Sequence, residues 1–181
     1  MLLKKKITSD SIVFLGDSLT EWFNLENYFL RKDIVNRGVA GDITDGVLYR
    51  LEEITAAAPK EIFLMIGIND IFQGYGVEQI TRNLKTIIDR IIEDTPSSKL
   101  TVQSILPINE DYFPIGDNMN SKINAVNEQL EGFCRLRKVK YINLHEHFLY
   151  KGKLNPEYTY DGGHLTEKGY EKWAQLLQAH L

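Results

Sequence analysis

The stretch SIVFLGDSLTEW, residues 11–22, places four apolar residues directly before Gly16-Asp17-Ser18. An apolar run that ends at a glycine is typical of a β-strand covered on both faces, as in a parallel sheet. The serine after this strand has two interpretations. It is either a cap of the following helix or a nucleophile displayed at the end of the strand.

Four more runs of this kind follow, and segments with helical spacing separate them. The expected strands cover residues 11–16, 33–38, 61–67, 99–107 and 139–144. The expected helices, in which apolar residues recur every three or four positions, cover residues 47–54, 80–94, 123–136 and 166–181. This alternation predicts a single-domain α/β fold of three layers (α/β/α), doubly wound and flavodoxin-like, on a five-stranded parallel sheet.

The composition indicates one globular domain spanning residues 1–181, with 43% hydrophobic and 25% charged residues. The formal net charge of -4 argues against a nucleic-acid partner, because such proteins concentrate Lys and Arg on one face. No apolar run approaches the roughly 18 residues of a membrane span, and the amino terminus lacks the pattern of a secretory signal. We therefore expect a cytoplasmic protein with no membrane span.

Small polar residues follow the first three expected strands, at Gly16–Ser18, Gly38–Asp42 and Gly67–Asp70. In a doubly wound sheet the carboxyl ends of the strands meet at one edge, where ligands bind. Glycine allows close backbone approach, and backbone N–H groups at helix starts point outward as donors. With the Asn69 amide, these groups are the parts of an oxyanion hole.

A serine nucleophile also needs a base, usually a histidine that a carboxylate orients. The segment YDGGHLTEKGY, residues 160–170, offers Asp161 and His164 on one loop, and Thr166 is placed to start the last helix. Taken singly, Ser18 is explained as a helix cap and Asp161 as a turn residue. The conjunction of four separated segments instead favours one site for acyl transfer.

These segments resemble the conserved blocks of the SGNH hydrolases, the GDSL-type esterases and lipases. Gly-Asp-Ser stands at residues 16–18, the glycine of the second block is Gly41, Gly-x-Asn-Asp stands at residues 67–70, and Asp-x-x-His ends at His164. The similarity spans residues 12–170. Within the family, GVAGDITDGVLYRL (residues 38–51) is most similar to the branch of platelet-activating-factor acetylhydrolase subunits and bacterial acyl esterases, which favours short acyl groups and makes a homodimer an expectation.

The resemblance implies an enzyme, a serine esterase that hydrolyses carboxylic esters of small molecules. It implies Ser18 as nucleophile, His164 as base and Asp161 as its orienting acid. It also implies the backbone N–H groups of Ser18 and Gly41 and the side chain of Asn69 as oxyanion donors. Two alternatives stay open: a carbohydrate O-deacetylase of the same fold, and a non-catalytic flavodoxin-like binding or assembly module.

No cofactor and no metal is expected. His145 and His147 flank Glu146 but lack the further ligands of a zinc site, and Cys134 has the spacing of a buried helix face. Asp17 and Asp70 are expected to brace turns rather than to react. The aromatic residues after Ser18 (Trp22, Phe23, Tyr28, Phe29) and the segment Tyr112-Phe113-Pro114 are expected to be mostly core, with one or two rings lining the acyl or the alcohol pocket.

Overall fold

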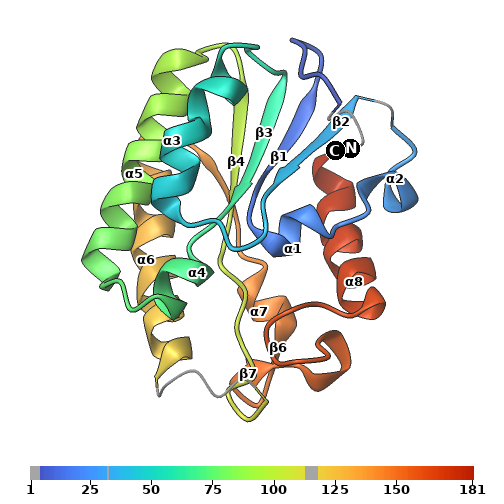
Figure 1. Ribbon diagram of the computed structural model, residues 1–181, viewed down its shortest axis with the longest axis vertical. Helices are drawn as coiled ribbons and strands as arrows, with labels where there is room; N and C mark the ends of the chain where they lie inside the picture. The colour runs from blue at the N-terminus through green and yellow to red at the C-terminus, as the bar shows by residue number, and fades with distance from the viewer. Residues whose placement is uncertain (1–4, 32, 113–117) are drawn as a thin grey trace.

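A five-stranded parallel sheet organises the chain in the computed structural model, which describes residues 5–31, 33–112 and 118–181 (Figure 1). The strand order is β2-β1-β3-β4-β5. The strands are β1 (Ile12–Gly16), β2 (Ile34–Gly38), β3 (Glu61–Met65), β4 (Lys99–Gln103) and β5 (Lys140–Ile142). The order reverses at β1, so the predicted doubly wound, flavodoxin-like α/β fold is confirmed.

Helices cover both faces of the sheet (Figure 1). On one face lie α3 (Thr44–Thr55), α5 (Val77–Asp94) and α6 (Met119–Arg137). On the other lie α1 (Ser18–Glu21), α2 (Leu25–Tyr28) and α8 (Glu167–Leu177). Two short helices, α4 (Ile68–Phe72) and α7 (His145–Phe148), lie with α1 toward the end of the sheet at which the strands finish.

Successive side chains of a strand point to opposite faces of the sheet, so alternate residues belong to two separate hydrophobic clusters. Val13 and Leu15 of β1 pack with the aliphatic residues of α3, α5 and α6. Ile12 and Phe14 face the opposite way and pack with α1, α2 and α8, where Phe23 and Trp173 stack. The buried thiol of Cys134 belongs to the first cluster, as predicted, and burial raises its pKa to about 12.

The predicted strands are longer than those of the structure, most of all the fourth and the fifth. The fourth was expected to reach Pro107 but ends at Gln103, and the fifth covers three residues instead of residues 139–144. A side chain takes over where pairing stops, because Asn127 of α6 accepts from the Ile105 N–H (2.8 Å) and donates to the Ile105 carbonyl (2.9 Å). Residues 105–108 thereby leave the sheet and line the site.

Several short elements differ from the prediction. They are the hairpin of β6 (Leu149–Tyr150) and β7 (Lys153–Leu154) and the 3-10 turns Pro156–Tyr158 and Gln178–His180. Thr166 caps α8, as predicted, by accepting from the Gly169 N–H (3.2 Å). Within the described residues, none of the helices combines the length and apolar character that crossing a bilayer requires.

Candidate active site

Ser18 lies at the point where β1 turns into α1, and its neighbours explain the tight geometry. Gly16 is required there, because a Cβ at that position would collide with the Met65 carbonyl and the Thr20 hydroxyl. Asp17 is the N-cap of α1, and its carboxylate accepts from the Leu19 N–H (3.0 Å). This turn fixes Ser18 as the first residue of α1, with only 7% of its surface exposed.

His164 and Asp161 lie on the loop that precedes α8, and the loop holds its own shape. The Asp161 carboxylate accepts from the backbone N–H groups of Gly163 (2.9 Å) and His164 (2.7 Å). Gly162 adopts a positive φ of 96°, which glycine tolerates without strain. The hydroxyl of the buried Thr159 donates to the His164 carbonyl (2.7 Å) and accepts from the Gly162 N–H (2.9 Å).

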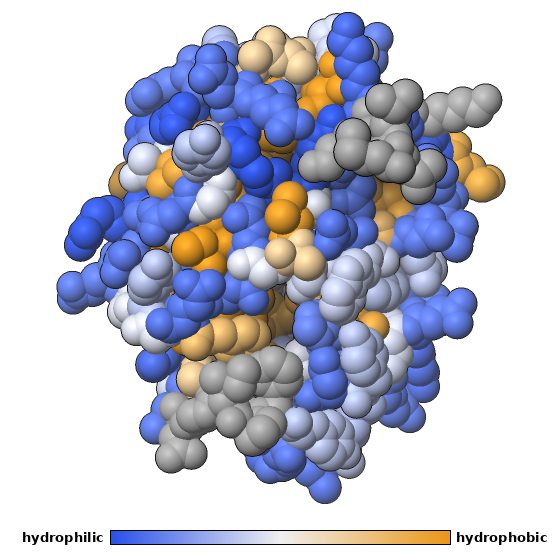
Figure 2. Space-filling view, viewed as in Figure 1, coloured by the Kyte–Doolittle hydropathy of each residue, from blue (hydrophilic) through white to orange (hydrophobic). Residues whose placement is uncertain are grey.

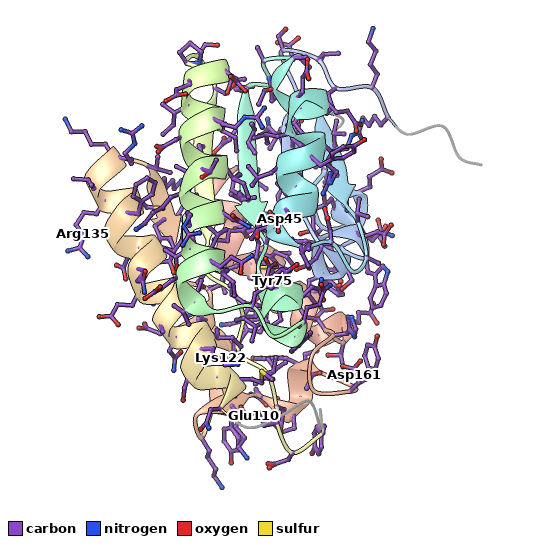
Figure 3. All side chains as sticks on the ribbon, turned by 60° about the vertical axis from the view of Figure 1, so that its left-hand side comes forward. Asp45, Tyr75, Glu110, Lys122, Arg135 and Asp161 are labelled. Atoms are coloured by element: carbon purple, nitrogen blue, oxygen red, sulfur yellow. The ribbon has the colours of Figure 1, made fainter. Side chains whose placement is uncertain are left out.

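The structure brings these two segments into one hydrogen-bonded chain. Ser18 Oγ lies 3.2 Å from His164 Nε2, and His164 Nδ1 lies 2.7 Å from Asp161 Oδ2. The side chains of His164 and Asp161 are 28% and 33% exposed. Figure 3 shows Asp161 on the side of the molecule opposite α6, which carries Lys122 and Arg135. The order serine, histidine and aspartate at these distances matches the geometry that an acyl-transfer triad requires.

Two carboxyl groups beside the serine have opposite pKa shifts. Burial raises the pKa of Asp17 to about 7, and repulsion from Asp42 and Asp70 adds to that effect. Burial also acts to raise the pKa of Asp161, but hydrogen bonds from the His164 ring and two backbone N–H groups outweigh it and leave the pKa below 3.8. Asp161 is therefore anionic at neutral pH, as an orienting acid must be, whereas Asp17 is the helix cap that the sequence predicted.

The expected oxyanion donors lie on three neighbouring loops. The Asn69 amide follows β3 and donates to the Asp42 carbonyl (2.8 Å), which ties it to the loop of Gly41. Gly41 has a positive φ of 77°. Within the part of the chain that the structure describes, neither the Ser18 N–H nor the Gly41 N–H has a hydrogen-bond partner. Both groups are thus available for an oxyanion.

Arg50 of α3 connects these loops, and sequence reasoning missed it. Its Nε pairs with the Asp42 carboxylate (2.9 Å) and its other end donates to the Gly16 carbonyl (3.2 Å). Asp70 connects α4 to the start of α3, because its carboxylate accepts from the N–H (3.0 Å) and the hydroxyl of Thr44. The sequence carries only a weak signal for this link, namely an arginine on a predicted helix 34 residues after Gly16.

An apolar cavity of about 100 Å³ opens beside the nucleophile. Ser18, Asn69 and His164 contribute its polar groups, and the apolar lining includes Met65, Ile68, Phe72, Ile105, Leu106 and Ile108. Figure 2 shows hydrophobic side chains around a hollow near the centre of this face, with hydrophilic ones around them. Gly41 does not line the cavity, so the structure brings it to the adjoining loop rather than to the cavity wall.

The aromatic residues after Ser18 are partly core, as predicted, and none of their rings lines this cavity. Phe23 and Phe29 are core residues, and neither Trp22 nor Tyr112 lines the cavity. Phe113 and Pro114 lie outside the described residues. Part of the wall comes from residues 105–108, of which 105–107 were assigned to a strand because their apolar run continues that of β4.

His145 braces the wall of the cavity. Its Nδ1 lies 3.1 Å from the Ile105 carbonyl, and its backbone N–H donates to Ser104 Oγ (2.8 Å). Burial lowers the pKa of this imidazole. Across residues 5–31, 33–112 and 118–181, no three His, Cys, Asp or Glu side chains are grouped so that they could hold a metal ion.

Known proteins resemble the chain in sequence. The model of the GDSL-like Lipase/Acylhydrolase family matches residues 14–172. Platelet-activating factor acetylhydrolase IB subunit alpha1 from Bos taurus is 28% identical over 195 residues, which cover 100% of this chain and 82% of the relative. N-acylneuraminate cytidylyltransferase from Streptococcus agalactiae is 28% identical over 169 residues, which cover 93% of this chain but only 37% of that enzyme.

Solved structures share the fold. A Streptococcus pneumonia protein described as a platelet activating factor has a TM-score of 0.84 and 31% identity, over 96% of this chain and 85% of that chain. A lipase/acylhydrolase from Enterococcus faecalis has a TM-score of 0.80 and 22% identity, over 94% of both chains.

Proposed function

The chain belongs to the GDSL-like lipase/acylhydrolase family and is a carboxylic ester hydrolase, and on that premise we propose that it releases short acyl groups through Ser18, His164 and Asp161. The observation that carries the proposal is the hydrogen-bonded chain from Ser18 Oγ to His164 Nε2 and from His164 Nδ1 to Asp161. An enzyme of this kind needs no cofactor, because the base and the acid are both side chains of the protein.

The proposed mechanism follows the geometry. Ser18 Oγ attacks the ester carbonyl while His164 Nε2 takes its proton, and the ionised Asp161 stabilises the imidazolium that forms. The carbonyl oxygen becomes an oxyanion, which the N–H groups of Ser18 and Gly41 and the Asn69 amide hold. His164 then gives the proton to the departing alcohol, and a water molecule repeats the sequence to release the acid.

The size of the cavity supports a short acyl group. An apolar cavity of about 150 Å³ accommodates a benzene molecule. The cavity here, of about 100 Å³, is smaller, so it accommodates a chain of a few carbon atoms rather than a fatty acyl chain. Its apolar walls suit the methyl or propyl end of an acetyl or butyryl group.

A second candidate, within the same chemistry, is removal of an acetyl group from a sugar. The supporting observation is the match to one part of a Streptococcus agalactiae N-acylneuraminate cytidylyltransferase, whose name refers to an acylated sugar acid. The match covers nearly all of this chain. A sugar acetate is also a short acyl ester, so the two candidates differ only in the alcohol.

Hydrolysis of p-nitrophenyl esters by the wild type and by Ser18→Ala tests the proposal. We expect at least about a 10⁴-fold loss of kcat/KM in Ser18→Ala, because the nucleophile is gone. The control is Ser121→Ala, which removes an exposed hydroxyl from α6 and should retain full activity. Equal rates in the wild type and Ser18→Ala would overturn Ser18 as the nucleophile.

Chain-length preference tests the acyl group separately. We expect acetyl and butyryl esters to be hydrolysed faster than octanoyl esters, because eight carbon atoms exceed the volume of the cavity. A preference for the octanoyl ester would contradict the short-acyl proposal but leave Ser18 as nucleophile.

A further inference from the structure

Gly41 lies on a loop whose position is not fixed by packing. The loop, residues 39–43, joins β2 to α3 and is called the Gly41 loop below. Gly41 is exposed, and within the described residues no atom beyond its chain neighbours comes within 4 Å of a Cβ placed on it. The position of the Gly41 N–H therefore depends on how the residues on either side are held.

Polar contacts hold both of these residues. The Ala40 N–H donates to the exposed carboxylate of Glu21 (3.0 Å). On the other side of Gly41, the Asp42 carbonyl accepts from the Asn69 amide (2.8 Å). Asp42 therefore connects two of the proposed oxyanion donors, the N–H of its neighbour Gly41 and the amide of Asn69.

Arg50 holds Asp42 and the end of β1 at the same time. Its Nε lies 2.9 Å from Asp42 Oδ2, and its other end donates to the Gly16 carbonyl (3.2 Å), two residues before Ser18. The side chains of Arg50 and Asp42 are only 16% and 10% exposed, so salt and water screen this ion pair little. Gly46 leaves the room for it, because a Cβ there would collide with the Asp42 carboxylate.

Arginine suits this position better than any other cation. Its planar guanidinium presents several N–H groups in a fixed fork and so reaches two acceptors on different loops, whereas lysine carries a single nitrogen. The fork is carried by a firmly packed helix, because Val47, Leu51 and Ile54 of α3 are fully buried. A buried ion pair contributes little net stability, since both charges lose water, so stability alone does not account for the pair.

We propose that Arg50 is a positioning residue of the oxyanion site. By binding the Asp42 carboxylate and the Gly16 carbonyl together, it sets the distance between the N–H groups of Gly41 and Ser18. This inference rests on the proposed function, in which these N–H groups and the Asn69 amide hold the oxyanion. Arg50 does not line the cavity, so it acts on the ester only through the backbone that it holds.

A variant without the ion pair tests the proposal. Arg50→Met alone would leave the Asp42 carboxylate buried without a cation, which destabilises a fold strongly. Arg50→Met is therefore combined with Asp42→Asn, which keeps an oxygen for the Ile43 N–H (3.1 Å). We expect kcat for p-nitrophenyl acetate to fall at least about tenfold, against about 10²- to 10³-fold for loss of a whole oxyanion donor. KM should stay within about twofold, because the donors act in the transition state. An unchanged kcat, or an increase in KM alone, would overturn the proposal.

Arg50→Lys separates the fork from the charge. The lysine keeps the positive charge beside Asp42 but cannot bind both acceptors in the same way, so kcat should again fall with little change in KM. Full activity in Arg50→Lys would overturn the bridging role, because the charge alone would then suffice. The matched control is Arg137→Met, which breaks an ion pair of similar length to Asp89 (2.7 Å) between α6 and α5. It should leave kcat and KM unchanged.

Amide hydrogen exchange separates this proposal from the proposed function. The Asp42 N–H donates to the Val39 carbonyl (3.0 Å) and the Ile43 N–H to the Asp42 carboxylate, so their exchange reports the Gly41 loop without turnover. In Arg50→Met with Asp42→Asn we expect both amides to exchange at least about tenfold faster, while amides in the middle of α3 keep their rates. Unchanged exchange at both amides would overturn the proposal even if the wild type hydrolyses esters through Ser18. If exchange rose but wild type and Ser18→Ala hydrolysed esters equally, the proposed function would fail and the hold of Arg50 on the Gly41 loop would stand.

Discussion

The two segments that meet at the site are held in place in different ways. The nucleophile segment, named for the proposed nucleophile Ser18, covers the last residue of β1 and all of α1 (residues 16–21), and Asp17, Ser18 and Leu19 are all buried. The base loop, residues 159–164, is partly exposed, and its shape depends on hydrogen bonds within the loop. One segment is positioned by packing and the other by its own polar contacts.

This difference suits the tasks of the two segments. A serine nucleophile and its oxyanion donors must keep a fixed geometry, which a close-packed interior provides. The base must exchange protons with water and with the leaving alcohol, which needs some exposure. We therefore expect changes in the base loop to cost activity with little loss of stability, and changes in the nucleophile segment to cost stability or alter its pH dependence.

The largest expected effect is that of His164→Ala. It removes the base, so kcat/KM for p-nitrophenyl acetate should fall about 10⁴-fold, as when other triads lose a member. The free energy of unfolding should change by less than about 1 kcal/mol, because the side chain is partly exposed. Urea unfolding and steady-state kinetics on the same preparation measure both.

The counterpart in the nucleophile segment is Leu19→Ala, which truncates a buried side chain and should cost about 2–5 kcal/mol of stability. If His164→Ala proved as destabilising as Leu19→Ala, the base loop would be part of the structural core and the comparison would fail.

The second effect is on pH dependence and compares Asp17 with Asp161. The pKa of Asp17 is about 7 in the folded protein, against 3.8 for an exposed group, so the folded state keeps a proton that the unfolded state has lost. The contribution of Asp17 to stability is therefore complete below about pH 4 and declines until about pH 7. Asp17→Asn retains an oxygen for the Leu19 N–H and does not ionise. As the pH rises from 5 to 8, the free energy of unfolding of Asp17→Asn should therefore increase by about 3 kcal/mol relative to that of the wild type.

The pKa shift of Asp161 has the opposite sign, and Asp161→Asn tests its effect on stability. The pKa of Asp161 is lowered, so its contribution to stability is present above pH 3.8 and disappears as the pH falls through the folded pKa. The stability difference between wild type and Asp161→Asn should thus stay constant from pH 5 to 8. Denaturant unfolding at pH 5 and at pH 8 measures the stability of each variant relative to the wild type. If the difference for Asp17→Asn were also the same at both pH values, the raised pKa of Asp17 would be contradicted.

Local sequence patterns were sufficient to predict the strands and the loops that follow them. Apolar runs predicted the five strands, and the turn residues after them predicted which loops would meet at the edge of the sheet. Ser18, Asn69, Asp161 and His164 could be selected because acyl transfer needs these residue types at one site, and the structure places them together.

What could not be predicted depends on contacts between distant segments. The end of β4 is set by the amide of Asn127, which replaces a neighbouring strand and lies 22 residues beyond Ile105. An apolar run carries no sign of such a partner. The position of Trp22 on His164 is another case, because the sequence shows an aromatic residue but not the ring, 142 residues away, that it contacts.

The smallest expected effect tests whether the base loop really depends on its own hydrogen bonds. The Thr159 hydroxyl binds both the His164 carbonyl and the Gly162 N–H. Thr159→Val keeps the shape but leaves two backbone groups without a partner, which costs about 1–3 kcal/mol of stability. Because the carbonyl of His164 is then no longer fixed, kcat should also fall, by about tenfold, with little change in KM. Thr159→Ser restores the hydroxyl and should recover most of the loss, whereas equal activity in the valine and serine variants would mean that packing, not hydrogen bonding, positions the base.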